Sequence, residues 1–118
     1  MKIKCFRDLE IWKLGKEIVK DIYRLSESMP VSQRYGISSQ MQRAAISIPS
    51  NIAEGFNRFQ NKEYRRFLYI ALGSCAELET QVEICSDLQY LSGEQKNSIL
   101  DKINHESKML ANLIKCLQ

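Results

Sequence analysis

The sequence contains few of the residues on which metal sites and catalytic triads depend. It has a single histidine, His105, and Asp101 one helical turn earlier leaves only a weak two-ligand metal site as an option. A di-iron site in a helical bundle takes Glu-x-x-His motifs from two helices, so one chain cannot supply it. No serine or cysteine is placed beside the imidazole, and the glycine-rich phosphate-binding and nucleophile-elbow motifs are missing. We therefore expect no enzymatic activity, no metal and no cofactor.

The four cysteines do not form a disulfide or zinc-binding pattern, because no two of them make a C-x-x-C pair. Cys75 and Cys85 lie on one predicted helix, about 15 Å apart at a rise of 1.5 Å per residue, which is too far for a disulfide. Both fall on apolar positions. They are interpreted as buried free thiols, in keeping with a reducing compartment.

Long apolar runs and linker-like segments are also lacking. No run approaches the roughly 20 apolar residues that span a bilayer, and the charged start MKIKCFRDLEIW has no signal-peptide pattern. With 44% hydrophobic residues and two prolines in 118 residues, a long disordered segment is not expected. We predict a single domain over residues 1–118 that is cytoplasmic and does not enter a membrane.

Charge is present but unevenly distributed. Residues 1–70 carry 13 lysines and arginines against 7 acidic residues, whereas residues 71–118 carry 4 against 7. This asymmetry indicates either a basic surface for a polyanionic partner or two complementary surfaces that meet between subunits.

Apolar residues recur at helical spacing along the whole chain, and no segment alternates like a strand. The predicted helices cover about residues 8–28, 38–56, 61–90 and 92–118. Their predicted N-caps are Asp8, Ser38, Asn61 and Ser92, and Gln95 completes a capping box with Ser92. Short connections make neighbouring helices antiparallel, so the predicted fold class is all-α, an up-down-up-down four-helix bundle.

The two middle helices carry the most specific packing signals. Pro49 has no N–H for the carbonyl of Ala45, so we predict a kinked but continuous second helix rather than two short ones. In the third helix, apolar residues alternate steps of four and three, which is typical of packing along a neighbouring helix at a shallow angle. These residues are Tyr64, Leu68, Ala71, Cys75, Leu78, Val82 and Cys85.

Several apolar residues lie off these main stripes, and they predict a subunit interface. They are Ile11, Leu14, Phe67, Ile70 and Leu72. A helix that is apolar on more than one face is buried on more than one side. In so small a bundle this pattern favours a homo-oligomer.

The run QRAAISIPSNIAEG, followed by NKEYRRFLYIALGSCAELETQ, resembles the four helix bundle protein family named after the intervening sequences of bacterial 23S ribosomal RNA genes. The opening FRDLEIWKLGKEIVKDIY and the later DLQYL also fit, so the resemblance covers nearly the whole chain. The accessory variability proteins of diversity-generating retroelements are similar.

The resemblance implies a left-handed antiparallel bundle that assembles into a pentameric ring, with nucleic-acid binding through basic surface. In the retroelement case it also implies a reverse transcriptase as partner. It brings no catalytic residue. Among the polar positions that match the family, Glu54 and Glu77 are candidate partners for Arg43.

Two groups of basic residues are candidate binding sites for RNA or DNA. The first lies at the corner between the second and third helices and consists of Arg58, Lys62, Arg65 and Arg66. There, Asn61, Lys62 and the first amides of the third helix are suited to gripping a phosphate, and Phe59 to stacking on an unpaired base. The second group lies along the first helix and consists of Lys13, Lys16, Lys20 and Arg24.

Both groups are open to a second interpretation, as ordinary solvated faces. Along the first helix, Glu17 is expected to pair with Lys13, and Asp21 with Lys20 or Arg24. The alternative function is a protein–protein adaptor or structural ring whose partner is another protein.

Overall fold

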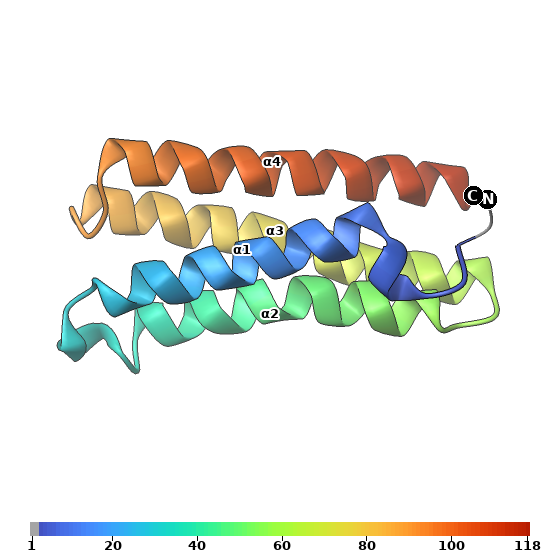
Figure 1. The fold of residues 1–118 in the computed structure, drawn as a ribbon, viewed down its shortest axis with the longest axis horizontal. Coiled ribbons are helices and arrows are strands. Elements are labelled where there is room, and N and C mark those ends of the chain that lie inside the picture. Colours follow the sequence, from blue (N-terminus) through green and yellow to red (C-terminus); the bar gives the residue numbers. More distant parts are fainter. Residues whose placement is uncertain (1–2) are drawn as a thin grey trace.

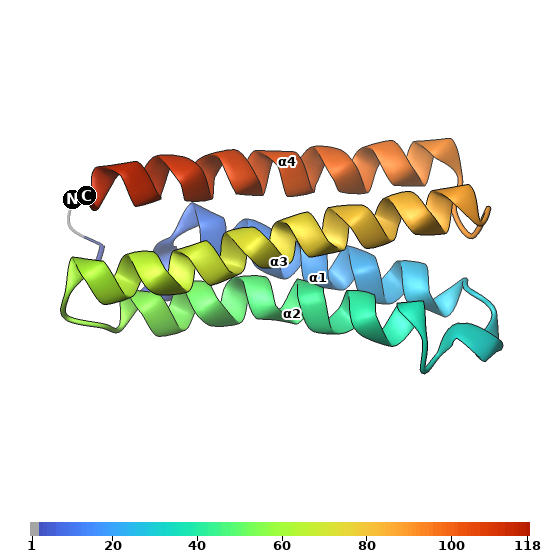
Figure 2. The ribbon, with the colours of Figure 1, turned by 180° about the vertical axis from the view of Figure 1, so that it is seen from behind.

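The structure is a computed structural model that describes residues 3–118, and within this range it is all-α. The four long helices are α1 (Glu10–Glu27), α2 (Ile37–Phe56), α3 (Asn61–Asp87) and α4 (Gly93–Cys116). Two short 3₁₀ turns, η1 (Phe6–Asp8) and η2 (Val31–Gln33), precede α1 and α2. Consecutive helices run in opposite directions along the 43 Å long axis (Figures 1 and 2), which is the predicted up-down-up-down order. The handedness of the bundle stays a prediction.

Three of the four predicted N-caps are wrong. Asp8 ends η1, so α1 starts two residues later, with Leu9 as its N-cap. Ser38 lies inside the first turn of α2 and is buried, and Asn61 is already the first residue of α3. In each case the residue just before the helix has extended or irregular backbone, and its side chain makes no capping hydrogen bond.

The fourth cap is confirmed. The backbone amide of Gln95 donates to Oγ of Ser92 at 3.1 Å, and the backbone amide of Ser92 donates to Oε1 of Gln95 at 2.8 Å. This reciprocal pair satisfies two amides that the helix itself leaves free. It fixes the start of α4 directly after a short turn.

Pro49 lies within α2, which continues without interruption from Ile37 to Phe56, so the prediction of one continuous helix is confirmed. The kink stays a prediction. Pro49 is buried, as are Ala45 and Ile52 on the same side of the helix. The proline ring therefore packs into the core rather than facing solvent.

The core follows the predicted steps of four and three. On α3 the predicted stripe is buried from Leu68 to Cys85, whereas Tyr64 is only partly buried. Cys75 and Cys85 are confirmed as buried free thiols. Burial raises the pKa of Cys75 to about 12, so its thiol stays protonated and unreactive.

The apolar residues that predicted a subunit interface are partly used inside the subunit. Phe67 and Ile11 are buried in the core, and Leu14 and Leu72 are half-buried against it. Ile70 remains 41% exposed. The surface left over for a partner is therefore smaller than these five residues suggest.

No helix among residues 3–118 is both long enough and apolar enough to cross a membrane.

Candidate nucleic-acid interface

The corner between α2 and α3 brings its four predicted basic residues to one end of the bundle, where α2 ends at Phe56 and α3 begins at Asn61. We call Arg58, Lys62, Arg65 and Arg66 the corner cations. Two of them contact a single aromatic ring: the guanidinium carbons of Arg58 and Arg66 lie 4.9 Å and 4.6 Å from the ring centre of Phe67. Cation–π contacts of this kind hold both guanidinium groups in place.

Both arginines are also paired with acidic residues. Arg58 lies 3.9 Å from a carboxylate oxygen of Glu54, and Arg66 lies 3.1 Å from one of Glu63. The hydrogen bond from Arg66 lowers the pKa of Glu63, and the charges of Arg58 and Lys62 lower it further. Four cations against two carboxylates leave the corner with an excess of positive charge.

Arg65 has a structural role. Its side chain is half-buried, and its guanidinium donates a hydrogen bond to the backbone carbonyl of Leu117. This bond joins the start of α3 to the end of α4. Arg65 is thereby less available to an external phosphate than its neighbours.

Lys62 and Phe59 are the most accessible groups at the corner. Lys62 is exposed, and no ion pair within 4 Å forms between it and any residue of the described part of the chain. It lies in the first turn of α3, whose N-cap residue, Gln60, makes no side-chain capping bond. Phe59 is fully exposed on the connection between the helices. An uncapped helix start, a free lysine and an exposed aromatic ring suit a phosphate and a base.

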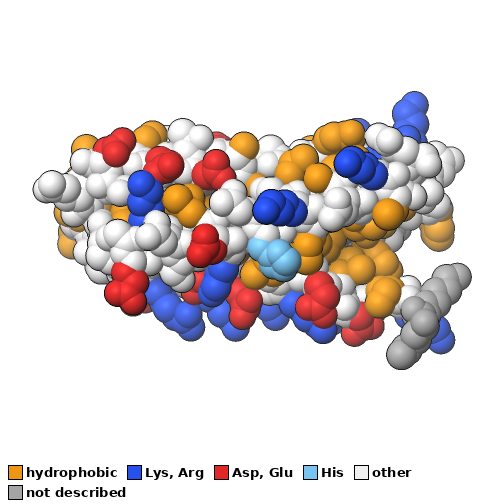
Figure 3. Space-filling view, turned by 90° about the horizontal axis from the view of Figure 1, so that it is seen from above, with side chains coloured by type: hydrophobic (Ala, Val, Ile, Leu, Met, Phe, Trp, Pro, Cys, Tyr) orange, Lys and Arg blue, Asp and Glu red, His pale blue; other side chains and the backbone are white. Residues whose placement is uncertain are grey.

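The second predicted group lies along α1, and local contacts neutralise much of it. Lys13 pairs with Glu10 at 3.6 Å, not with Glu17 as predicted. The amine of Lys16 lies 4.5 Å from the ring centre of Trp12. Figure 3 shows basic and acidic side chains alternating along the edge of the molecule formed by α1. This face is mixed in sign rather than a continuous basic stripe.

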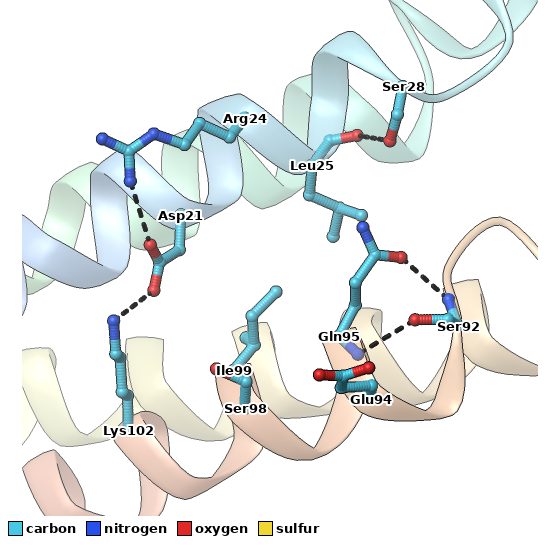
Figure 4. Close-up of a pocket in the computed structure, with 10 residues that line it drawn as sticks. All are labelled: Asp21, Arg24, Leu25, Ser28, Ser92, Glu94, Gln95, Ser98, Ile99 and Lys102. Carbon is cyan, nitrogen blue, oxygen red and sulfur yellow. Dashed lines mark hydrogen bonds and ion pairs between the residues drawn. The ribbon is translucent and has the colours of Figure 1, made fainter.

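At its far end the α1 group is tied to α4. Asp21 accepts from Arg24 at 3.4 Å, as predicted, and from Lys102 of α4 at 2.7 Å. The two ion pairs border a cleft of about 410 Å³ between α1 and the start of α4 (Figure 4). Because Asp21 is only 19% exposed, Arg24 is held by a shielded partner. Of the α1 cations, Lys20 is the one for which no ion pair or cation–π contact occurs among residues 3–118.

The other polar positions are arranged differently from the prediction. Glu54 pairs with Arg58 rather than with Arg43. Arg43 and Glu77 border the same shallow cleft between α2 and α3 without coming within ion-pair distance. Ser47 and Ser74 line the same cleft, and their hydroxyls are hydrogen-bonded at 2.8 Å.

Within residues 3–118, no three histidine, cysteine or acidic side chains lie close enough to hold a metal ion. His105 is exposed and lines a cleft of about 530 Å³ between α1 and α4. Asp101, its predicted partner in a weak site, does not line that cleft.

Glu106 is the residue that sequence reasoning missed. It is 0% exposed, and neither carboxyl oxygen has a hydrogen-bond partner within the described chain. Burial raises its pKa to about 8. A signal for this position exists, because Glu106 falls between Ile103 and Leu110 in the same steps of three and four that define the apolar stripe of α4.

Comparisons with known proteins support the sequence resemblance. A crystal structure of a protein with unknown function from the S23 ribosomal protein family of Bacteroides thetaiotaomicron VPI-5482 is similar to this chain, with a TM-score of 0.83 and 26% sequence identity. The match covers 89% of this chain and 98% of that one. No curated protein matches the chain. The similarity to accessory variability proteins stays a prediction. The model of the 23S rRNA-intervening sequence protein family matches residues 7–112, so the chain belongs to that family.

Proposed function

We propose that this protein is a non-enzymatic, cytoplasmic, oligomeric helical bundle that binds RNA or DNA through the corner between α2 and α3. The observation that carries the proposal is the fully exposed ring of Phe59 beside the uncapped start of α3 and the exposed Lys62. A base stacks on such a ring while its phosphate meets the lysine and the helix amides.

Arg58 and Arg66 add positive charge that attracts the nucleic-acid backbone. Arg58 and Arg66 are exposed but fixed on Phe67, so they present positive charge at defined positions without reading bases. Because duplex nucleic acid hides its base faces, the use of Phe59 favours unpaired nucleotides. In a ring of subunits, such as the pentamer that the resemblance implies, several weak corners act together and strengthen binding.

The test is fluorescence anisotropy with labelled single-stranded and duplex oligonucleotides of equal length over a range of salt concentrations. Phe59→Ala is expected to weaken single-strand binding by about 1–3 kcal/mol per stacked base. Lys62→Ala is expected to lower the salt slope by about 0.7–0.9 for each phosphate it neutralises. Lys108→Ala, an exposed lysine on α4, is the matched control and should bind like the wild type.

Replacing all four corner cations with alanine should abolish binding, but this variant also removes the Arg65–Leu117 bond, so the single changes are more informative. Tight binding that is insensitive to salt would contradict the proposal. So would Phe59→Ala and Lys62→Ala variants that bind as well as the control.

The second candidate function is an adaptor that binds another protein, such as a reverse transcriptase. It is favoured by exposed apolar side chains on α3 and directly after it: Ile70, Ile84 and Leu88 are 41%, 42% and 52% exposed. A pull-down repeated with nuclease treatment separates the two functions. A protein partner that survives nuclease supports the adaptor, and one that is lost supports nucleic-acid binding.

A further inference from the structure

Gly15 of α1, Pro49 of α2 and Glu106 of α4 come together inside the bundle and depart from ordinary apolar packing. We call these three residues the Gly15 layer. A Cβ atom placed on Gly15 would lie 3.0 Å from Oε2 of Glu106 and 3.4 Å from ring atoms of Pro49. The absence of a side chain at Gly15 therefore leaves room for the Glu106 carboxyl.

The carboxyl in this layer has no charged partner. Both of its oxygens are buried without hydrogen bonds from the described residues, and burial alone raises its pKa to about 8. An ionised carboxylate is unstable in such surroundings, so Glu106 is neutral in the closed bundle at neutral pH.

The titratable groups around Glu106 do not compensate its charge. α3 contributes the thiol of Cys75, whose pKa is raised by burial first and then by the charges of Glu106 and Glu79. α2 contributes the uncharged Pro49. Toward solvent, the cleft beside the layer is lined on α4 by His105 and on α1 by both signs of charge, from Glu10, Lys13 and Glu17.

The contact between α1 and α4 lies directly over this carboxyl. It is the least extensive contact between neighbouring helices, and clefts of about 410 and 530 Å³ open along it. Leu14 and His105, which immediately precede Gly15 and Glu106 in the chain, line the wider cleft.

We propose that Glu106 is a proton-sensitive contact between α1 and α4. In its neutral form it lets the two helices close over it. When Glu106 loses its proton to water, a charged carboxylate without partners is left inside the bundle. Because this carboxylate is stabilised by hydration, α1 moves away from α4 and lets water reach it. The device thus loosens α1, the helix that carries Lys13, Lys16, Lys20 and Arg24, as pH rises.

The direction of the effect on stability follows from proton binding. The ordinary pKa of a glutamate is 4.5, and that of Glu106 in the folded chain is about 8. Between these values the folded chain holds a proton that the unfolded chain has released. Stability contributed by this group is therefore complete below pH 4.5, falls as pH rises toward 8, and is constant above it.

The test compares thermal unfolding of the wild type, Glu106→Gln and Asp101→Asn from pH 4.5 to 9. Glutamine keeps the shape without titrating, so the melting temperature of Glu106→Gln should exceed that of the wild type by a margin that grows with pH up to about 8. Asp101 is exposed on the same helix, so Asp101→Asn should follow the wild type at every pH. Parallel curves for the wild type and Glu106→Gln would overturn the proposal.

Hydrogen exchange on the full-length wild type locates the change, and it decides the question even if Glu106→Gln does not fold. After correction for intrinsic exchange rates, protection of α1 amides should fall between pH 6 and pH 9 more than protection of α2 and α3. Equal loss in all helices, or no loss in α1, would overturn the proposal.

Discussion

At the scale of single residues, Gly55 and Gly73 show how differently two helical glycines tolerate a methyl group. A Cβ at Gly55 would lie 2.8 Å from Cβ of Phe67 and 3.1 Å from Cδ1 of Tyr64. A Cβ at Gly73 would meet nothing within 4 Å among the described residues. Gly55 therefore permits the close approach of α2 and α3 beside the corner, whereas Gly73 is not needed for packing within the subunit.

Gly55→Ala is expected to lower the free energy of unfolding by about 1–3 kcal/mol, because neither α3 nor the Phe67 side chain can move away without disturbing the core. Gly73→Ala should raise it by about 0.5–1 kcal/mol, since alanine loses less backbone entropy than glycine in a helix. Urea denaturation at one protein concentration measures both. A Gly55→Ala variant as stable as the wild type would contradict the close packing of α2 against α3. A Gly73→Ala variant less stable than the wild type would indicate that a neighbouring subunit packs against α3 at Gly73.

Residue identities predicted the core better than they predicted the candidate site. The steps of four and three located Leu68 to Cys85 because burial follows directly from helical geometry. The corner cations were identified, but spacing along the chain gave no sign that Arg65 would bind the carbonyl of Leu117, 52 residues away. Glu106 was overlooked because a charged residue is assumed to face solvent, although its spacing placed it in the apolar stripe.

At the scale of secondary-structure elements, helix starts were predictable only where the capping side chain had no competitor. Asp8, Ser38 and Asn61 are good capping residues by type, yet none of them is an N-cap. Asp8 belongs to η1, Ser38 is buried inside the first turn of α2, and Asn61 is the first residue of α3 after the short loop at residues 57–60. Ser92 is an N-cap as predicted, because Ser92 and Gln95 each accept a hydrogen bond from the backbone amide of the other.

Ser92→Ala should destabilise the fold by about 1 kcal/mol, because the amide of Gln95 loses its acceptor at the start of α4. Ser92→Asp should retain most of the stability, since its carboxylate accepts the same bond and favours the positive end of the helix. Chemical denaturation of both variants checks this pair. Ser32→Ala, at an exposed residue of η2 for which no side-chain hydrogen bond occurs among residues 3–118, is a control for serine removal and should have a smaller effect. Equal losses in both alanine variants would contradict the role of the capping box.

At the scale of the whole molecule, the fold alone leaves part of its surface unexplained. Ile70 and Ile84 of α3 and Leu88 directly after it lie on one side at helical spacing, and each is more than 40% exposed. The second half of α3 carries four acidic residues, which contrast in charge with the corner cations: Glu77, Glu79, Glu83 and Asp87. Exposed apolar side chains beside charge of one sign are suited to a second copy of the chain that brings the opposite sign.

Light scattering coupled to size-exclusion chromatography is expected to give a mass well above the 13.7 kDa of one chain, and close to five times that value if the ring implied by the sequence resemblance forms. Ile70→Arg together with Ile84→Arg should shift the mass toward a single chain, because two charges would be desolvated in the contact. Val31→Arg is the control, since Val31 is 76% exposed on the connection before α2 and should leave the mass unchanged. A mass of one chain at every concentration would contradict the oligomer. The nucleic-acid binding proposed above would then depend on a single corner, because no neighbouring subunit would add its contacts.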